Sequence, residues 1–242
     1  MKNIKFWYRA LRYRYKIDPA EINFIIKNLK PGDIAVDIGS HKGGYLFWMV
    51  KQVGQAGKVY AFEPQKKLFN YLKSIVKTKK YANVFLENKG LSDSSGRVEF
   101  HIPVTSSGSS PGARIGELNE ELPTKVQSID VVTLDNFFLK KGIIPTLIKI
   151  DVEGHEKEVL TGGLELLKKH KPKIIMECEN RHLKSGDVFD VFKLLIDLGY
   201  EGSFFENKEL KPLAGFKIET QQKTGEGRFW ESDGYVNNFV FV

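Results

Sequence analysis

The sequence contains a single cysteine, Cys178, among 242 residues. One thiol cannot form an intrachain disulfide, so we expect a fold held by its apolar core in a reducing, cytoplasmic compartment. Long apolar runs are also missing, since none approaches the roughly 18 to 20 residues that a membrane-spanning helix needs. The basic N-terminal residues are not followed by the apolar stretch of a secretory signal. These absences favour a soluble or at most peripheral protein.

Acidic residues are outnumbered, with 30 Asp and Glu against 37 Lys and Arg, which gives a net charge of +7. This excess could favour contact with phosphates, anionic lipid or an acidic glycan, but a solvated basic surface is the simpler explanation. Hydrophobic residues at 41% and charged residues at 28% are typical of a globular protein. The length suits one large domain, and we expect a helical cap over residues 1–30 and a main domain over residues 31–242.

Aromatic and basic side chains alternate over residues 1–16, which predicts an amphipathic helix. Such a helix either caps the domain or touches an anionic membrane. A second helix is predicted directly afterwards, with Asp18 as its N-cap, Pro19 in its first turn and Glu21 completing a capping box.

The most informative stretch is a short apolar strand at residues 34–38 that breaks on glycine and leads into a helix from Tyr45. Glycines at such a turn permit positive φ and close approach of a ligand to the backbone, and the helix start offers free N–H donors. Because His41 stands where a dinucleotide motif has its second glycine, the spacing Asp-x-Gly-x-x-x-Gly predicts a different polar ligand. The predicted contacts are Asp37, Gly39, Ser40, His41 and Gly43. We expect a bulky residue at position 39 to abolish ligand binding and leave the fold largely intact.

Glu63 follows the next predicted strand, residues 58–62, at the distance where this topology places an acid on ribose hydroxyls. A helix and a third strand at residues 83–87 complete a parallel βαβαβ unit. The alternating residues 97–102 then predict a strand hairpin inserted before the fourth core strand. The Ser- and Gly-rich residues 105–112 are interpreted as a loop that shapes the substrate side.

Two carboxylates and an imidazole lie close together in the sequence after the buried strand within residues 146–150. Asp151, Glu153 and His155 follow its C-terminal end, the edge where open α/β sheets bind ligands, and we expect one of them to act as a general base. A structural alternative makes Asp151 an N-cap and Glu156 a first-turn acid of a helix over residues 159–167. A divalent-metal option combines four residues, namely Asp151, Glu177, Glu179 and His182.

The remaining pattern completes an α/β sheet. We predict a fifth strand at residues 173–178, a helix at residues 187–198, and closing strands at residues 202–205 and 236–242. Residues 215–234 are interpreted as an excursion at the sheet edge.

Four segments in order resemble the FkbM family of S-adenosylmethionine-dependent methyltransferases: Asp18 to Glu21, Val36 to Gly43, Phe62 to Pro64 and Lys149 to Glu156. The last segment is the most specific of the four. The resemblance covers most of residues 17–200 and implies a Rossmann-like, seven-stranded, mostly parallel sheet with helices on both faces, and it makes residues 31–242 the methyltransferase domain. The chain departs from the family's usual Gly-Ala-Asn by having Gly39, Ser40 and His41 at the first turn.

The resemblance further implies S-adenosyl-L-methionine as cofactor and S-adenosyl-L-homocysteine as product. It also implies an adenine-side contact after the third strand, at Leu91, Ser92 and Asp93, beside the contacts of Glu63, Pro64 and Asp151. The predicted function is O-methylation of a sugar, glycolipid or small metabolite. The alternatives are methylation of RNA or another acceptor, a nicotinamide-dependent oxidoreductase, and a nucleic-acid-binding module. The chain has no recognisable Tyr-x-x-x-Lys site for hydride transfer and no evident aromatic-basic RNA-binding motif, which disfavours the last two.

Overall fold

The structure, a computed structural model, describes residues 2–104, 112–116 and 123–242, with no side-chain description at residues 2 and 3. Its centre is an eight-stranded sheet in the order β11-β10-β12-β9-β8-β1-β2-β3. The parallel strands are β1 (Ile34–Ile38), β2 (Lys58–Phe62), β3 (Val84–Glu87), β8 (Leu147–Ile150) and β9 (Lys173–Glu177). The antiparallel strands are β10 (Gly202–Glu206), β11 (Glu209–Pro212) and β12 (Asn238–Phe241). The predicted mostly parallel Rossmann-like sheet is therefore confirmed, with β11 as an unpredicted edge strand.

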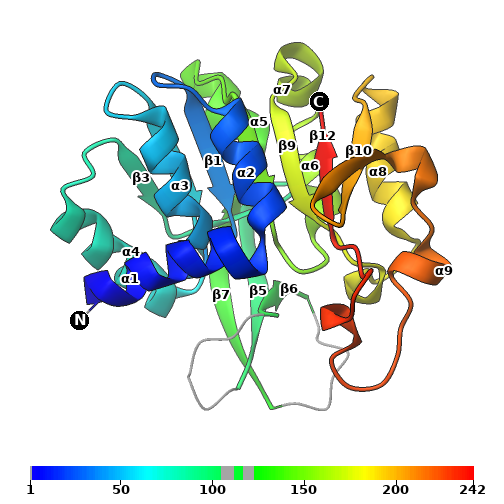
Figure 1. Cartoon of the computed structure of the whole chain (residues 1–242). Coiled ribbons are helices and arrows are strands. Elements are labelled where there is room, and N and C mark those ends of the chain that lie inside the picture. The colour runs from blue at the N-terminus through cyan, green and yellow to red at the C-terminus, as the bar shows by residue number, and fades with distance from the viewer. Residues whose placement is uncertain (1, 105–111, 117–122) are drawn as a thin grey trace.

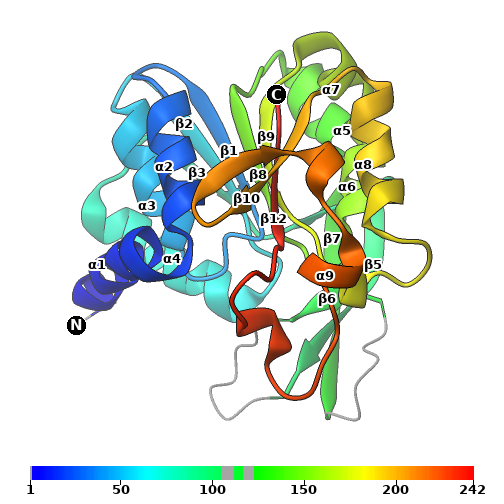
Figure 2. The same ribbon diagram turned by 45° about the vertical axis from the view of Figure 1, so that its right-hand side comes forward.

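Helices cover both faces of this sheet, as Figures 1 and 2 show. One face carries α1 (Lys2–Arg12), α2 (Pro19–Asn28), α3 (Gly44–Val53) and α4 (Lys66–Lys79), and the other carries α5 (Leu134–Phe138), α6 (Glu156–Thr161), α7 (Leu164–His170) and α8 (Val188–Asp197). Successive residues of β1 point to opposite faces of the sheet, so Ala35 packs against the side of α1 to α4 and Val36 against the side of α5 to α8. Both faces of the central strands are thus buried, which explains their near-continuous apolar sequences.

A second, four-stranded sheet follows β3, in the order β4-β7-β5-β6. Its strands are β4 (Gly90–Leu91), β5 (Gly96–Pro103), β6 (Arg114–Ile115) and β7 (Thr124–Val132). The long antiparallel pair β5 and β7 confirms the predicted inserted hairpin. It extends below the C-terminal ends of the central strands in Figure 1. Of the predicted loop at residues 105–112, only Gly112 lies within the described residues.

Two helix predictions are wrong in detail. The helix expected over residues 159–167 is divided into α6 and α7 at Gly162, where a Cβ atom would lie 2.1 Å from the main-chain oxygen of Ser92. Asp151 is not an N-cap, because α6 begins after His155. Asp18 does occupy the N-cap position of α2, but its carboxylate makes no cap and accepts a hydrogen bond of 2.9 Å from the Tyr45 hydroxyl.

Residues 215–234 were expected at the sheet edge, but part of this segment lies against the ends of the central strands. It contains α9 (Ile218–Gln221) and a 3₁₀ turn, η5 (Phe229–Glu231). The buried Gln222 amide donates to the main-chain oxygens of Cys178 and Val236 at 2.8 Å each, which ties the segment to the ends of β9 and β12. Among the described residues, no helix is both long and apolar enough to cross a membrane.

Candidate active site

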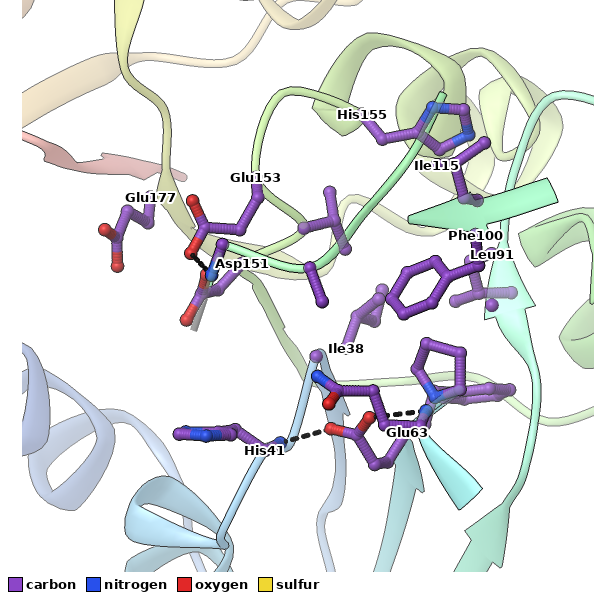
Figure 3. A pocket seen from close by; sticks show the side chains of 18 of the residues that line it. Ile38, His41, Glu63, Leu91, Phe100, Ile115, Asp151, Glu153, His155 and Glu177 are labelled. Atoms are coloured by element: carbon purple, nitrogen blue, oxygen red, sulfur yellow. Dashed lines mark hydrogen bonds between the residues drawn. The ribbon is translucent and has the colours of Figure 1, made fainter. Parts of the chain in front are cut away.

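A cavity of about 480 Å³ lies at the C-terminal ends of the parallel strands, between them and the second sheet (Figure 3). Its size is within the range typical of small-ligand sites. The residues predicted from sequence that line it are Gly39, His41, Glu63, Pro64, Leu91, Asp151, Glu153, His155 and Glu177. The structure therefore gathers residues from four strand ends at the edge where open α/β sheets bind ligands.

The turn after β1 is held tightly against its neighbours. Gly39 has a φ of +80°, and the main-chain N–H groups of Gly39 and Ser40 both donate to the oxygen of Phe62, at 3.1 and 3.0 Å. A Cβ atom on Gly39 would lie 1.9 Å from the main-chain oxygen of Asp151. The expectation that a bulky residue at position 39 leaves the fold intact is therefore wrong, because it would push β1 and β8 apart.

Glu63 is a buried acid whose carboxylate organises this turn. One oxygen accepts from the N–H of His41 and the other from the N–H of Gln65, each at 2.8 Å. Burial raises the pKa of Glu63 to about 8, against the opposing effect of these two hydrogen bonds. Each carboxylate oxygen keeps a second lone pair for a ligand hydroxyl.

The second sheet supplies an apolar wall that the sequence did not identify as part of the site. Phe100 of β5 and Ile115 of β6 face the cavity near Leu91, and Ile38 and Pro64 line it as well (Figure 3). The alternation of residues 97–102 signalled a half-buried strand, but not what that strand covers. An apolar wall of this kind suits a flat aromatic group such as a nucleobase.

The opposite end of the cavity is acidic. Asp151, Glu153 and Glu177 lie together there in Figure 3, and the buried Lys149 ammonium lies 2.8 Å from Asp151 Oδ2. Burial alone would lower the pKa of Lys149, but the carboxylates around it, with Asp151 first, raise it overall. Burial and the surrounding acids raise the pKa of Glu177 well above its ordinary value. A cationic ligand group would be stabilised at this end.

Glu153 occupies a backbone position with φ of +55° and projects into the cavity. Its Oε1 accepts from the N–H of Gly112 at 3.0 Å, and its Oε2 lies 3.1 Å from His182 Nδ1. Burial raises the pKa of Glu153 to about 7, with Asp151 contributing in the same direction. The next residue, Gly154, cannot be replaced easily, because a Cβ atom would lie 2.2 Å from the oxygen of His182.

His155 lies at the Ile115 end of the cavity, away from Asp151 and Glu177 (Figure 3). Its Nε2 is 2.9 Å from Ser92 Oγ, and its Nδ1 is 3.5 Å from Glu158 Oε2. Burial lowers its pKa from the ordinary value. This geometry places the imidazole beside the apolar wall and joins α6 to the segment after β4.

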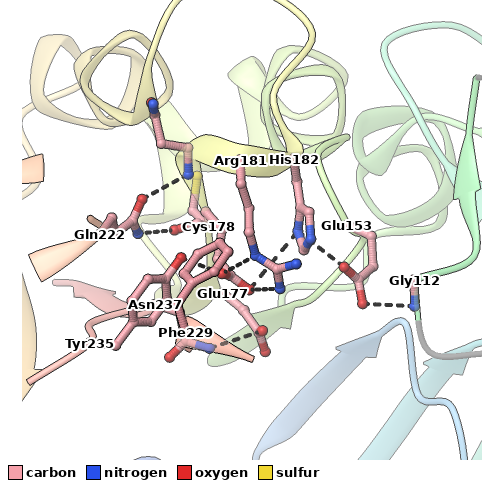
Figure 4. A network of polar contacts seen from close by, with 12 residues as sticks. Gly112, Glu153, Glu177, Cys178, Arg181, His182, Gln222, Phe229, Tyr235 and Asn237 are labelled. Atoms are coloured by element: carbon pink, nitrogen blue, oxygen red, sulfur yellow. Dashed lines mark hydrogen bonds and ion pairs between the residues drawn. The ribbon is translucent and has the colours of Figure 1, made fainter. Parts of the chain in front are cut away.

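A polar network stands behind Glu153 (Figure 4). Glu179 pairs with the Arg181 guanidinium at 2.7 and 3.0 Å and accepts from the Tyr235 hydroxyl at 2.6 Å. His182 faces Glu153, and burial lowers its pKa to about 4. Within the described part of the chain, no three acidic, histidine or cysteine side chains are grouped to hold a metal ion. The structure therefore does not group the four residues of the metal option, Asp151, Glu177, Glu179 and His182, as one ligand set. Glu179 pairs with Arg181 and Tyr235, and His182 lies against Glu153.

Several predicted contacts lie outside the cavity lining, namely Asp37, Ser40, Gly43, Ser92 and Asp93. Gly43 instead permits close packing, because its Cβ atom would lie 2.9 Å from the Phe6 ring. Both carboxylate oxygens of the buried Asp37 lack a hydrogen-bond partner among the described residues, and burial raises its pKa. Asp37 thus lies behind the glycine turn, outside the lining of the cavity.

Comparison with known proteins points to one family. Residues 37–201 match the family model described as the methyltransferase FkbM domain. No curated protein matches the chain. The crystal structure of methyltransferase FkbM from Methylobacillus flagellatus KT aligns with a TM-score of 0.56 at 16% identity, covering 100% of this chain and 55% of that one. The chain thus spans about half the length of that protein, and the similarity supports the fold.

Two other solved structures align more loosely. A SAM-dependent methyltransferase from Aquifex aeolicus gives a TM-score of 0.47 at 17% identity, covering 95% of this chain and 91% of that one. A SAM-dependent O-methyltransferase from Thermotoga maritima gives 0.47 at 13% identity, covering 92% and 64%.

Proposed function

The chain belongs to the FkbM family of S-adenosylmethionine-dependent methyltransferases, and from that premise we propose that it methylates a hydroxyl oxygen of a sugar, glycolipid or other small metabolite. The observation that carries this proposal is the position of Glu153, which faces the cavity beside Asp151 and whose pKa is raised by burial to about 7. A hydroxyl acceptor is barely ionised at neutral pH, so its methylation benefits from a base with a pKa near the working pH.

The cavity fits the cofactor that the family uses. S-adenosylmethionine, when bound, supplies a methyl group on a positively charged sulfur and leaves as S-adenosylhomocysteine. Leu91, Phe100 and Ile115 offer an apolar surface to the adenine, and Glu63 offers its free lone pairs to the ribose hydroxyls. Asp151 offers negative charge to the cationic end, and Glu177 lies beside it.

Glu153 is the proposed general base. The Gly112 N–H, which donates to one carboxylate oxygen, and His182 Nδ1, which lies 3.1 Å from the other, hold the carboxylate in one orientation. Each oxygen retains a lone pair that can accept the proton of an acceptor hydroxyl. Methyl transfer is an in-line displacement, so orientation of the acceptor oxygen supplies much of the remaining rate.

Asp151 and His155 are assigned different parts. Asp151, held by Lys149, is proposed to bind the cationic end of the cofactor. His155, bonded to Ser92 and remote from Glu177 in Figure 3, is proposed to position the apolar wall and not to take the proton.

Single-turnover methyl transfer from labelled S-adenosylmethionine into fractionated cell extract, followed by isolation of the labelled acceptor, tests this assignment. Glu153→Gln should lower the rate at saturating cofactor by about 100-fold or more and leave cofactor affinity within about threefold. Asp151→Asn should weaken cofactor affinity, and His155→Asn should lower the rate far less than Glu153→Gln. Undiminished rates in all three variants with unchanged cofactor affinity would refute the proposal.

A further inference from the structure

The outward face of α1 and the following turn is an exposed apolar stripe, which we define as Ile4, Tyr8, Leu11 and Tyr15. Their side chains are 74%, 68%, 38% and 73% exposed. The spacing of four, three and four residues places them along one side of a helix. Single exposed apolar residues are ordinary on a protein surface, but a contiguous row of this kind marks an interaction surface.

The opposite face of α1 is firmly docked, so the stripe is part of the folded domain. Phe6 and Ala10 are completely buried against α3 and α4, and the Trp48 indole donates to the oxygen of Ala10 at 2.8 Å. The Arg9 guanidinium donates to the Lys42 oxygen at 3.1 Å. Figures 1 and 2 show α1 lying along the outside of the molecule.

The charged residues of this N-terminal segment are all basic. Residues 1–17 contain six basic side chains and no acidic one. Lys5, Arg12 and Lys16 are exposed beside the stripe, and the Lys79 ammonium of α4 lies 5.5 Å from the Trp7 ring centre. An apolar and aromatic stripe flanked by cations matches the chemistry of an anionic bilayer surface, with aromatic rings at the level of the headgroups.

The same helical segment reaches the candidate active site. Arg12, Tyr13 and Ile17 line the cavity, and Ile17 is 40% exposed. A bilayer in contact with the stripe would therefore lie beside one wall of the cavity.

We propose that the stripe binds an anionic phospholipid surface and thereby presents the cavity to a membrane-borne, hydroxyl-bearing acceptor. The choice of acceptor rests on the proposed function, whereas membrane binding does not. Of the acceptors considered above, this arrangement favours a glycolipid over a freely diffusing metabolite.

Co-sedimentation of the full chain with vesicles tests the surface without any acceptor. Phosphatidylcholine vesicles with about 30% phosphatidylglycerol should bind the protein, and pure phosphatidylcholine vesicles should bind it at least about tenfold more weakly. The double variant Ile4→Ser with Tyr8→Ser should lose at least about tenfold in partitioning onto anionic vesicles. Lys5→Glu with Lys16→Glu should lose a similar factor, and added salt should weaken the wild type.

The matched control is Ile196→Ser with Leu210→Ser, which removes two side chains of 45% and 44% exposure from α8 and β11. This control should bind vesicles like the wild type, and all variants should bind S-adenosylmethionine equally. Absence of binding to anionic vesicles, or equal binding by the Ile4 and Tyr8 variant, would overturn the proposal. A wild-type dimer that becomes monomeric in that variant, without vesicle binding, would assign the stripe to a second copy of the chain. Because neither donor nor acceptor takes part, these results are independent of methyl transfer.

Discussion

Replacing Glu63 with glutamine is expected to weaken S-adenosylmethionine binding by about 30- to 150-fold. In the wild type both carboxylate oxygens accept main-chain N–H groups at 2.8 Å and retain lone pairs toward the cavity. A hydrogen bond to a charged group contributes about 1.5–3 kcal/mol, against about 0.5–1.5 kcal/mol for a neutral pair. Losing the charge at two ribose hydroxyls therefore costs about 1–1.5 kcal/mol each, or roughly 2–3 kcal/mol together. Each 1.4 kcal/mol is about tenfold in affinity.

The pH dependence of the same binding gives a second, independent readout. Burial raises the pKa of Glu63 to about 8, and hydroxyl donors from a ligand would favour its ionised form. Donor affinity should therefore rise with pH up to about pH 8 in the wild type and level off above it, and the Gln variant should lack this component.

Isothermal titration calorimetry at several pH values measures both effects. The control is Glu87→Gln, which neutralises an acid at the end of the adjacent strand β3, 3.9 Å from the Lys89 ammonium. Thermal melts establish that each variant is folded. Affinity of the Glu63 variant within about threefold of the wild type, with the same pH dependence, would refute the ribose assignment.

Three further predictions concern the base, a buried acid and the helix cap. The rate at saturating cofactor should rise with pH through about 7, because Glu153 must be ionised to accept a proton. If the rate of Glu153→Gln rose with pH in the same way, Glu153 would be excluded as the base. Burial raises the pKa of Glu21 from 4.5 to about 8, so the free energy of unfolding of the wild type falls as the pH rises from 4.5 to 8. In urea titrations, Glu21→Gln should increase this free energy by ~2–4 kcal/mol at pH 8 and change it little at pH 4.5. An increase that does not depend on pH would contradict this prediction. Gly43→Val should lower the free energy of unfolding by ~2–4 kcal/mol in the same titration, because φ is +77° and the Phe6 ring is too close for a side chain. Gly142→Val, at a position with positive φ and open space around it, should lower it less. Equal losses would refute the packing argument.

The strands of the core could be predicted from sequence because their signals are local. The observed β1 and β2 have the predicted bounds, 34–38 and 58–62, since apolar runs end at Gly39 and at Glu63 followed by proline. The fold class followed from the order of these elements and from the four family-like segments. The division of α6 from α7 has a local signal in the pair Gly162 and Gly163, which the prediction of one continuous helix overlooked. The close approach of the Ser92 oxygen to Gly162 is a tertiary contact that the sequence does not show.

The candidate site was only partly predictable for a similar reason. Glu63, Asp151 and Glu153 follow strand ends, so the topology alone brings them to one edge. Phe100 and Ile115 belong to the second sheet, and their alternating pattern indicates a buried face without naming its partner. Positive-φ glycines are ambiguous too, because Gly43 serves packing against α1 and not the cavity.

The most direct test of the central claim is the position of the transferred methyl group. The protein should be incubated with methyl-labelled S-adenosylmethionine and fractionated cell extract, and the labelled product should be identified by NMR and mass spectrometry. The account predicts a methyl ether on a hydroxyl oxygen, formed at a strongly reduced rate by Glu153→Gln. Label on a nitrogen, carbon or sulfur atom, or O-methylation that proceeds unchanged in that variant, would contradict it.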